Sequence, residues 1–369
     1  MPQTIQLTDA LDSSAITAIK NFCTDFCQQN NPVPRWVMGR NEYAQMLADA
    51  ISIEGFIDDF THLNQWQGKP VVSADNVAKN SLVINTSTAH TLVAQTHLNN
   101  LQLRNLDFYA FYLNAPLRLP AVSYFSGFTE DFKNNQQKYQ WVYSLLQDDL
   151  SRDTFRKLLN YRTSGDSRFL QNFSFRIQQQ YFDCIRLKNA DETFLDVGSY
   201  DGQSSIEFIR YCPDYTSIHI FEPEMFNEGL CRKKLQNYPN IFFYPYGLSD
   251  RKDILRFSAL GSASQISSKG TQFIHVDCLD NLLQSGTKPT FIKMDIEGAE
   301  LPAIAGAEKT IARYHPTLAL SIYHKVGDYW KIPEAVFSIR DDYSVYIRHY
   351  IEGLIETVMY FVPPGRQLR

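Results

Sequence analysis

The stretch Thr193-Phe-Leu-Asp-Val-Gly-Ser-Tyr-Asp-Gly202 decides the fold of this chain. Its apolar first half, which ends at Val197, predicts a buried strand, and a helix is expected to begin just after Gly202. Between them lies a loop in which an acid, Asp196, precedes the glycines Gly198 and Gly202. Glycine permits a positive φ and a close approach of a ligand to the backbone. The first N–H groups of the following helix are free to face that ligand. The loop therefore predicts a ligand-binding site.

The acid in this loop favours one class of ligand. A carboxylate just before Gly198 would repel a pyrophosphate, but it suits a ligand end that carries an ammonium or a sulfonium. The usual dinucleotide fingerprint also contains three glycines, which this loop lacks. The pattern favours S-adenosylmethionine (SAM) over a dinucleotide, with an ordinary strand-to-helix turn as the alternative.

Two further predicted strands end in acids. The segment Ile218-His-Ile-Phe-Glu-Pro223 places Glu222 about one βαβ unit after the first loop, where an acid can accept hydrogen bonds from both ribose hydroxyls. The segment Phe291-Ile-Lys-Met-Asp-Ile-Glu-Gly-Ala-Glu300 also ends in charged residues. Ligands of an open α/β sheet bind in the crevice outside the carboxyl ends of its strands. We therefore expect the three strand ends to converge on one crevice.

The alternation of predicted strands and helices indicates an α/β protein with three parts. A chain of 369 residues is long enough for more than one domain. Residues 1–125 are predicted to form a smaller Rossmann-like α/β domain, and residues 126–188 a helical linker or lid. Residues 189–369 are predicted to form the domain that holds the glycine loop.

Three local predictions concern segments outside the main motifs. Residues 107–113 are expected to form the last strand of the first domain. The helical spacing of Phe173, Ile177 and Phe182 predicts a helix that leads into the organising strand. Residues 261–268, which are rich in glycine and serine, are predicted to form a loop between two strands.

The first domain has part of a nucleotide-binding pattern. Gly39 follows a predicted strand, and Asp58 lies about 20 residues further on, where a ribose-binding acid would lie. The loop after Gly39 has no second glycine, however, and Glu42 would face any phosphate. A docking or structural module is therefore favoured over a nucleotide site.

Composition limits the partners and the location that we expect. The net charge of −5 and the pI near 5.9 give no reason to expect nucleic acid or an anionic membrane as partner. No apolar run approaches the ~20 residues of a membrane span, and the first residues lack the pattern of a signal peptide. The six cysteines are scattered along the chain, which fits a reducing cytosol. A cytoplasmic protein is therefore expected.

The motifs together resemble the FkbM family of SAM-dependent methyltransferases. They are Leu-Asp-Val-Gly-Ser-Tyr-Asp-Gly, Phe-Glu-Pro, Lys-Met-Asp-Ile-Glu-Gly-Ala-Glu and His-Pro-Thr-Leu-Ala-Leu-Ser. The resemblance covers about residues 190–362, and Asp-Ile-Glu-Gly-Ala-Glu is its most specific part. It implies a seven-stranded, mostly parallel sheet with an antiparallel final strand. It also implies methyl transfer to a hydroxyl oxygen, often of a sugar, glycan or natural product. Many members have Asn-x-Gly where this chain has Tyr200-Asp-Gly202.

The residues predicted to bind SAM come from the loop and the strand ends. They are Asp196, Gly198, Ser199, Tyr200, Asp201, Gly202, Glu222, Pro223, Gly247, Leu248 and Asp295. Gly247 and Leu248 follow the strand after Glu222, where they could flank the adenine. A plain turn is the alternative reading of that stretch.

Asp295, Glu297 and His324 are the candidate catalytic residues. Alternate residues of a strand share a face, so Lys293, Asp295 and Glu297 are expected to point together toward the acceptor. His324 lies just past the next strand and could act as a general base near neutral pH. A surface or hydrogen-bonding role is the alternative for this histidine. Glu300 is expected mainly to cap the following helix.

Other classes of function remain open at this point. One is a nicotinamide-dependent oxidoreductase, and another is a nucleotide- or sugar-binding protein with a degenerate methyltransferase fold. Asp295 and Glu297 could also hold Mg²⁺ through hard oxygen ligands. No further ligand set is evident in the sequence, so no metal site is assigned. The partner expected is a small-molecule or glycan hydroxyl acceptor.

Overall fold

A computed structural model describes residues 6–9, 13–188, 190–258, 265–266 and 270–366. Most of the predicted loop at 261–268 lies outside these residues. The chain divides into two compact units, each built from more than one segment. The first consists of Met1–Lys133, Asp153–Phe175 and Tyr350–Ile355, and the second of Asn134–Arg152, Arg176–His349 and Glu356–Arg369. The segment 126–188, predicted as a linker or lid, therefore contributes residues to both units.

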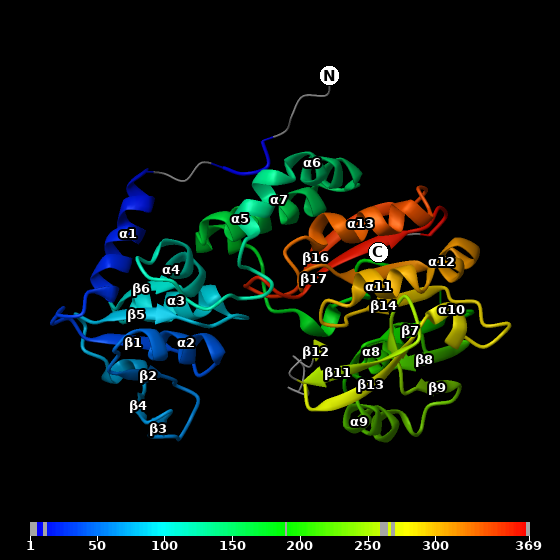
Figure 1. Cartoon of the computed structure of the whole chain (residues 1–369), viewed down its shortest axis with the longest axis horizontal. Coiled ribbons are helices and arrows are strands. Elements are labelled where there is room, and N and C mark those ends of the chain that lie inside the picture. Colours follow the sequence, from blue (N-terminus) through cyan, green and yellow to red (C-terminus); the bar gives the residue numbers. More distant parts are fainter. Residues whose placement is uncertain (1–5, 10–12, 189, 259–264, 267–269, 367–369) are drawn as a thin grey trace. The chain divides into compact units, whose positions relative to one another are not determined.

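The first unit is built on a six-stranded sheet with the order β3-β4-β2-β1-β5-β6 (Figure 1). The strands are β1 (Arg35–Met38), β2 (Gly55–Ile57), β3 (Gln65–Trp66), β4 (Lys69–Val72), β5 (Leu82–Asn85) and β6 (Arg104–Asp107). All neighbours pair in parallel except β3, which is antiparallel to β4. The first strand, β1, lies in the middle of the sheet. The next strands, β2, β4 and β3, are added on one side of it, and β5 and β6 on the other. This order confirms the predicted α/β class.

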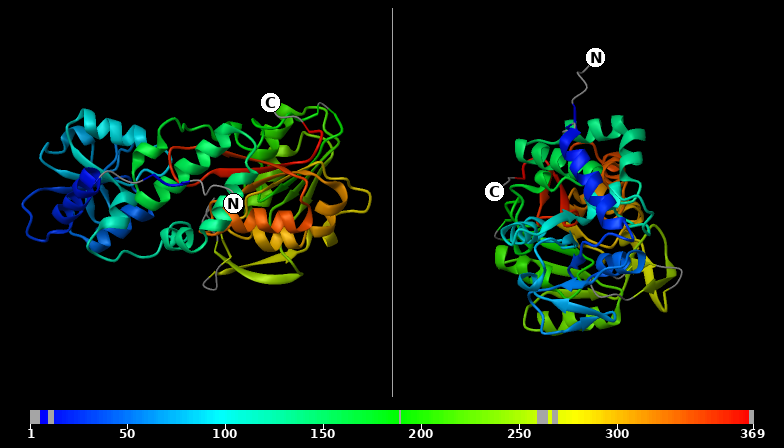
Figure 2. Two further views of the ribbon diagram at one scale, coloured as in Figure 1. Left: turned by 90° about the horizontal axis from the view of Figure 1, so that it is seen from above. Right: turned by 90° about the vertical axis from the view of Figure 1, so that its left-hand side faces the viewer.

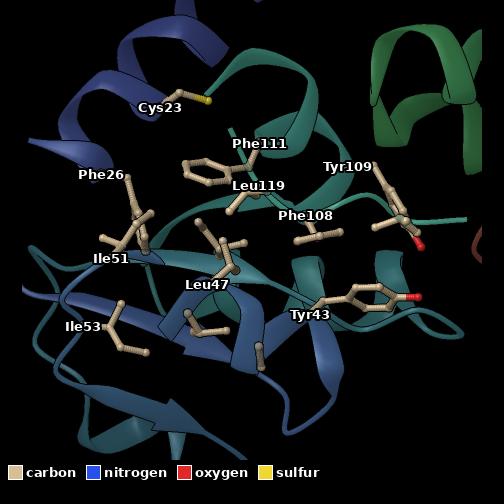
Figure 3. Close-up of a cluster of buried hydrophobic side chains, with 14 of the residues drawn as sticks. Cys23, Phe26, Tyr43, Leu47, Ile51, Ile53, Phe108, Tyr109, Phe111 and Leu119 are labelled. Carbon is tan, nitrogen blue, oxygen red and sulfur yellow. The ribbon is translucent and has the colours of Figure 1, made fainter. Parts of the chain in front are cut away.

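Helices cover both faces of this sheet. They are α1 (Ser13–Cys27), α2 (Glu42–Ala50), α3 (Thr91–Asn100) and α4 (Phe108–Asn114), with a 3-10 turn η1 (Ala74–Asn76). One face of the strands joins α1, α2 and α4 in a core that contains Phe26, Leu47 and Phe111 (Figure 3). The other face joins α3 in a smaller core that contains Val83 and Leu98. Burial on both faces explains why β2 and β5 are mostly apolar.

The prediction of a strand over residues 107–113 is wrong. β6 ends at Asp107, and α4 begins at the next residue. The carboxylate of Asp107 accepts hydrogen bonds from the backbone N–H groups of Tyr109 (2.9 Å) and Ala110 (3.3 Å). Such a cap satisfies N–H groups that have no partner within the helix. The aromatic residues of segment 108–112 are compatible with a strand or with a buried helix, and the cap formed by Asp107 favours the helix.

The second unit contains a seven-stranded sheet with the order β16-β17-β15-β14-β7-β8-β9. The strands are β7 (Thr193–Val197), β8 (Ser217–Phe221), β9 (Ile241–Tyr244), β14 (Phe291–Met294), β15 (Thr317–Ser321), β16 (Ser344–His349) and β17 (Thr357–Val362). β17 runs antiparallel to both its neighbours, whereas β7, β8, β9, β14 and β15 are parallel. The predicted mostly parallel sheet with an antiparallel final strand is therefore confirmed.

Helices flank this sheet, and a smaller sheet accompanies it. The helices are α6 (Gln136–Leu145), α8 (Gln203–Tyr211), α9 (Met225–Leu235), α10 (Leu279–Leu282), α11 (Glu300–Ala305), α12 (Glu308–Tyr314) and α13 (Asp328–Ile339). The smaller sheet has the order β10-β13-β11-β12, with β10 (Gly247–Leu248), β11 (Asp253–Ser258), β12 (Gln265–Ile266) and β13 (Gln272–Asp277). Its long yellow strands project from the body of this unit (Figure 2). Helices α5 (Phe128–Asn134) and α7 (Asp149–Ser164) each have residues in both units.

The prediction of a helix over Phe173, Ile177 and Phe182 is also wrong. This segment has only short 3-10 turns, η2 (Ser167–Leu170) before it and η3 (Ile177–Gln179) within it. Tyr181 has a φ of +74°, which an α-helix does not allow. Its phenol is hydrogen-bonded to a residue far along the chain, as described below, so a tertiary contact accompanies this non-helical backbone. None of the described helices is long and apolar enough to cross a membrane.

Gly165→Ala should destabilise the first unit much more than Gly127→Ala. Both glycines have a positive φ, a conformation that costs an alanine roughly 1–2 kcal/mol. A Cβ on Gly165 would lie 2.4 Å from the backbone of Ala110 in α4, whereas a Cβ on Gly127 would meet nothing within 4 Å. We expect overpacking to add about 1–3 kcal/mol at Gly165 only. Equal losses of amide protection in α4, measured by hydrogen exchange, would contradict this packing.

Candidate functional site

Gly198 connects the glycine loop to the end of β14. It has a φ of +76°, and a Cβ at this position would lie 1.9 Å from the carbonyl oxygen of Asp295. The backbone N–H of Gly198 also donates to the carbonyl of Phe221 at the end of β8 (3.0 Å). The sequence analysis attributed this glycine to the approach of a ligand. The structure shows that the approach of two backbone segments requires it first.

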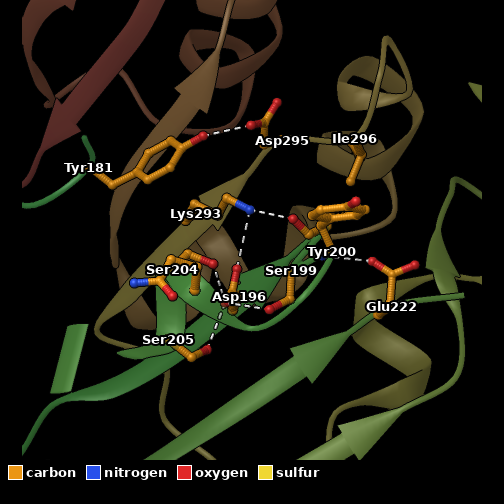
Figure 4. Close-up of polar contacts among 12 residues, drawn as sticks. Tyr181, Asp196, Ser199, Tyr200, Ser204, Ser205, Glu222, Lys293, Asp295 and Ile296 are labelled. Atoms are coloured by element: carbon orange, nitrogen blue, oxygen red, sulfur yellow. Dashed lines mark hydrogen bonds and ion pairs between the residues drawn. The ribbon is translucent and has the colours of Figure 1, made fainter. Parts of the chain in front are cut away.

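Asp196 is turned into the protein rather than toward a ligand. It is fully buried, and its Oδ2 accepts hydrogen bonds from the hydroxyls of Ser199 (2.8 Å), Ser204 (2.6 Å) and Ser205 (2.7 Å). Its Oδ1 lies 3.2 Å from Nζ of Lys293 (Figure 4). The expectation that this acid faces an ammonium or sulfonium is therefore corrected. The carboxylate holds the loop and the first turn of α8 together.

Lys293 is the positive partner of this buried acid. It lies on β14 and is buried, and its Nζ donates a hydrogen bond to the carbonyl of Gly198. The same ammonium lies 5.4 Å from the ring centroid of Tyr181. Lys293 was expected to point toward an acceptor together with Asp295. Instead, it ties β14 to the glycine loop.

Glu222 lies beside the same loop, directly after β8. Its Oε2 accepts a hydrogen bond from the N–H of Tyr200 (2.9 Å), and its Oε1 accepts one from the N–H of Glu224 (3.1 Å). Burial raises the pKa of Glu222 to about 7, against the lowering effect of these N–H groups and of Lys293. A carboxylate has about four lone-pair sites. Two of them therefore remain for further donors, such as the hydroxyls of a ribose.

Asp201 and Gly202 fit the loop onto α9. Asp201 Oδ2 pairs with Nζ of Lys234 (2.5 Å), so this carboxylate is engaged with α9. Gly202 has a φ of +82°, and a Cβ there would lie 3.3 Å from the Cα of Cys231. The loop side chain most exposed to solvent is that of Tyr200, at 41%. Of the loop residues predicted to bind SAM, Asp201 and Gly202 therefore make contacts with the protein itself.

Pro223 and Gly247 meet at the next strand end. Pro223 is half-buried after β8, and a Cβ on Gly247 would lie 3.7 Å from Cγ of Pro223. Leu248 is buried, whereas Gly247 is half-buried. The structure therefore brings Pro223 and Gly247 together with Glu222, and of the pair in β10 only Gly247 has substantial exposed surface.

The three predicted catalytic residues lie close together. Asp295 follows β14, and His324 lies beyond the end of β15. Nε2 of His324 is 3.3 Å from Oδ1 of Asp295 and 3.6 Å from Oε2 of Glu297. The expected reason for this grouping is wrong, because β14 ends at Met294 and Glu297 lies in a turn with a φ of +54°. The turn, rather than strand alternation, places Glu297 beside the histidine.

Glu300 has a larger part in this cluster than capping. Its buried carboxylate accepts a hydrogen bond from the N–H of Ile296 (3.0 Å), which is the expected local role. The same oxygen, Oε1, lies 2.9 Å from Nδ1 of His324. Glu300 therefore orients the imidazole as well as the turn that begins α11.

Sequence reasoning missed three residues of this cluster. The phenol of Tyr181 donates a hydrogen bond to Oδ2 of Asp295 (2.6 Å), and that of Tyr323 donates to Oδ1 (3.4 Å). Glu356, which accepts a hydrogen bond from Nε2 of Gln180 (2.7 Å), is coupled electrostatically to Asp295. Tyr323 could have been found by its place after β15. Tyr181 and Glu356 lie in irregular segments, where no periodic pattern marks them.

The cluster concentrates negative charge around one imidazole. Burial would lower the pKa of His324, but Glu300, Asp295 and Glu297 raise it to about 10. Burial raises the pKa of Glu297 and that of Glu356 to about 7. Burial would also raise the pKa of Asp295, yet His324 and Lys293 hold it below its usual range. The ionised form is thus favoured for Asp295 and disfavoured for Glu297 and Glu356.

The first unit uses its nucleotide-like features internally. A Cβ on Gly39 would lie 2.5 Å from Oγ1 of Thr86, so this glycine permits a close contact between the ends of β1 and β5. Asp58, the candidate ribose-binding acid, pairs with Nε of Arg40 (2.6 Å). The docking or structural module that the sequence favours over a nucleotide site stays a prediction.

Together, the strand order and the loop after β7 define a methyltransferase fold. Residues 196–343 match the family model described as the methyltransferase FkbM domain. This part of the chain is therefore a methyltransferase domain of the FkbM family. A comparison with curated protein sequences found no match.

A solved structure has a similar fold. The methyltransferase FkbM from Methylobacillus flagellatus KT has a TM-score of 0.75 at 20% identity, over 94% of this chain and 98% of that chain. At this identity the similarity shows a shared fold. Aeropyrum pernix fibrillarin in complex with S-adenosyl-L-methionine has a TM-score of 0.33 at 10% identity, over 48% of this chain and 69% of that chain. Such a low score carries no argument about function.

Lys293→Met should destabilise the second unit far more than Lys234→Met. Both lysines pair with an acid of the glycine loop, but Lys293 and Asp196 are buried whereas Lys234 and Asp201 are about one-third exposed. An unpaired buried charge costs about 3–5 kcal/mol, whereas an exposed pair contributes about 0–1 kcal/mol. Urea unfolding of the two variants measures the difference. Similar losses would show that Lys293 does not neutralise Asp196.

Proposed function

We propose that this chain transfers a methyl group from SAM to a hydroxyl oxygen of a small molecule or glycan. The observation that carries the proposal is the contact between Gly198 and Asp295, which joins two functional groups of residues. On one side is the loop with Glu222, whose carboxylate has lone pairs left for hydroxyl donors. On the other is the cluster of Asp295, Glu297 and His324. A cofactor site and an acceptor site must share such a border for methyl transfer.

The residues at the carboxyl ends of β7, β8 and β9 fit SAM. Glu222 would accept hydrogen bonds from the two ribose hydroxyls, and the exposed Tyr200 would lie beside them. Pro223 and Gly247 would flank the adenine. Asp196 would act indirectly, because its oxygens are engaged by hydroxyls and by a lysine. Asp196 would therefore determine the shape of the loop without contacting the cofactor.

The chemistry required of the protein is alignment and proton removal. Bound SAM supplies a methyl group on a sulfonium: the O–CH₃ bond forms as S–CH₃ breaks, the sulfur keeps the electron pair, and the hydroxyl proton passes to a base. Asp295 is the base that we propose, since its carboxylate is ionised and 21% exposed. The phenol of Tyr181 fixes its Oδ2 by a hydrogen bond. Alignment of the acceptor then supplies much of the rate.

His324 is better suited to orient Asp295 than to compete with it as a base. An imidazole flanked by three carboxylates holds a proton or another cation firmly, whereas a general base must be free to accept a proton. The hydroxyl acceptor is favoured by the family resemblance, which is an associational argument. A nicotinamide dinucleotide is disfavoured because the sequence has no three-glycine loop.

Glu222→Gln should weaken the binding of S-adenosylhomocysteine (SAH) and remove its dependence on pH. Hydrogen bonds to a charged group contribute about 1.5–3 kcal/mol, so calorimetry should show at least a tenfold loss. In the unmodified chain, the pKa of Glu222 is about 7. Above that pH the carboxylate is ionised and affinity should be constant, and affinity should fall as the pH drops below about 7.

The matched control for this prediction is Glu228→Gln. Glu228 lies on the neighbouring helix α9, where it pairs with Arg232 on the surface. This variant should keep both the affinity and its pH dependence. A loss well under tenfold in Glu222→Gln, with the pH dependence intact, would mean that another residue holds the ribose.

Asp295→Asn should lower kcat more than Glu297→Gln does, with SAH affinity nearly unchanged. Removal of a general base typically costs about 10²–10⁴-fold in kcat. The assay follows SAH release once an acceptor is found, and calorimetry with SAH reports separately on the cofactor site. If Asp295→Asn mainly weakens SAH binding, Asp295 belongs to the cofactor site. If both variants keep near-normal kcat, catalysis here depends on positioning alone.

A further inference from the structure

The imidazole of His324 is held in one orientation by Glu300. The side chain is only 6% exposed, and its Nδ1 lies 2.9 Å from Oε1 of Glu300. Its Nε2 is buried and has no hydrogen-bond partner among the described residues. Yet Oδ1 of Asp295 and Oε2 of Glu297 lie only 3.3 and 3.6 Å from it. The two carboxylates are therefore close to Nε2 without accepting a hydrogen bond from it.

This arrangement calls for a cation at Nε2, a place that a proton holds when no metal is bound and that a divalent ion would take over. When Nδ1 carries the proton shared with Glu300, Nε2 presents a lone pair. A lone pair that faces the carboxylates of Asp295 and Glu297 is repelled by both. A cation bonded to Nε2 and flanked by the two oxygens would convert this repulsion into attraction.

The spacing of Nε2 from each of the two carboxylate oxygens agrees with metal ligation. Nitrogen and oxygen ligands lie about 2.0–2.2 Å from a transition metal, so neighbouring ligands are roughly 3–3.5 Å apart in tetrahedral or octahedral geometry. The Nε2 distances of 3.3 Å to Asp295 and 3.6 Å to Glu297 need little adjustment. Ligand atoms of Asp295, Glu300 and His324 lie within 4.8 Å of one another. Glu300 is on the Nδ1 side, however, so it cannot share an ion with Nε2.

The charges around the histidine point the same way. Asp295, Glu297, Glu300 and Glu356 all act electrostatically on His324 or on its neighbour Asp295. Lys293 acts on Asp295 from a distance, but its ammonium contacts Asp196 and the carbonyl of Gly198. The ammonium of Lys325 contacts the carbonyl of Gly298. One imidazole among these acids leaves an excess of negative charge. A divalent cation would balance it.

We propose that His324 Nε2, Asp295 and Glu297 bind one divalent metal ion, with Glu300 holding the imidazole through Nδ1. A carboxylate on the second nitrogen of a ligating histidine is the usual support of such a ligand. One imidazole with two carboxylates suits Mn²⁺, Fe²⁺ or Zn²⁺ better than Mg²⁺, which prefers oxygen ligands. The sequence suggests no further ligand beside Asp295 and Glu297, and in the structure His324 supplies one.

The use of this ion rests on the proposed function. Three protein ligands leave coordination positions for water or for an oxygen of the acceptor. A hydroxyl bound to a divalent cation has a lower pKa, so its proton leaves more readily to Oδ2 of Asp295, the oxygen of that carboxylate that does not face the ion, before the hydroxyl oxygen attacks the methyl group. Metal binding itself does not depend on the acceptor and can be tested without it.

The test uses the full chain, freed of metal with a chelator and titrated with Mn²⁺ alone. Electron paramagnetic resonance should show one bound Mn²⁺ per chain, and spin-echo modulation should show the ¹⁴N of one imidazole. Calorimetry with Zn²⁺ should give the same stoichiometry. The proposal is overturned if neither ion binds stoichiometrically, or if bound Mn²⁺ shows no ¹⁴N modulation. This measurement on the unmodified chain does not depend on the folding of any variant.

Variants then assign the ligands. His324→Gln should abolish the ¹⁴N signal, and Glu300→Gln should weaken Mn²⁺ binding by about 10–100-fold, as expected for a supporting residue. His275→Gln is the matched control, because His275 is exposed on β13 and should leave Mn²⁺ binding unchanged. A ¹⁴N signal that survives in His324→Gln would contradict the assignment.

SAH affinity, measured in parallel on the metal-free chain, separates this inference from the proposed function. Binding of SAH without any binding of Mn²⁺ or Zn²⁺ would remove the metal site and leave the cofactor proposal standing. Binding of Mn²⁺ without SAH affinity would support the metal site and overturn the proposed function.

Discussion

The buried pair of Lys293 and Asp196 is the interaction on which the site of the second unit depends. A lysine and an aspartate are stable inside a protein only when each charge is compensated. Here the ammonium also binds the carbonyl of Gly198, and the carboxylate binds three serine hydroxyls. The pair thus joins β14, the glycine loop and α8. It fixes the close approach of Gly198 to Asp295, which connects the loop with the acidic cluster.

The acidic cluster shows how a parallel sheet can gather residues that are distant in sequence. β14 and β15 are neighbours and parallel, so the segments that follow them leave the sheet at the same edge. That edge brings His324 beside Asp295. Tyr181 and Glu356 reach the cluster from irregular segments outside the parallel strands. Four separate stretches of the chain therefore contribute to one cluster of charged groups, in which each group shifts the pKa of its neighbours.

The observed positions of three predicted site residues show which inferences from sequence hold in the structure. Glu222 lies beside the glycine loop as expected, because a βαβ unit fixes the spacing between successive strand ends. Asp196 was expected to face a ligand but is buried, since a strand-end acid can be compensated from inside as well as outside. Glu297 joined the correct cluster for the wrong reason: the strand ends before it, and a turn supplies its direction.

The sequence by itself determined the α/β class, the seven-stranded sheet and the strand ends that carry the site. The α/β class and the strand ends follow from local periodicity, whereas the seven-stranded sheet is what the resemblance to the FkbM family implies. Only the tertiary structure decided which acids are compensated, that Asp107 caps a helix, and that Tyr181 bonds to Asp295. Such contacts depend on distances between segments remote in the chain. The partner of a side chain, and therefore its ionisation state, is determined only when the strands assemble into the sheet.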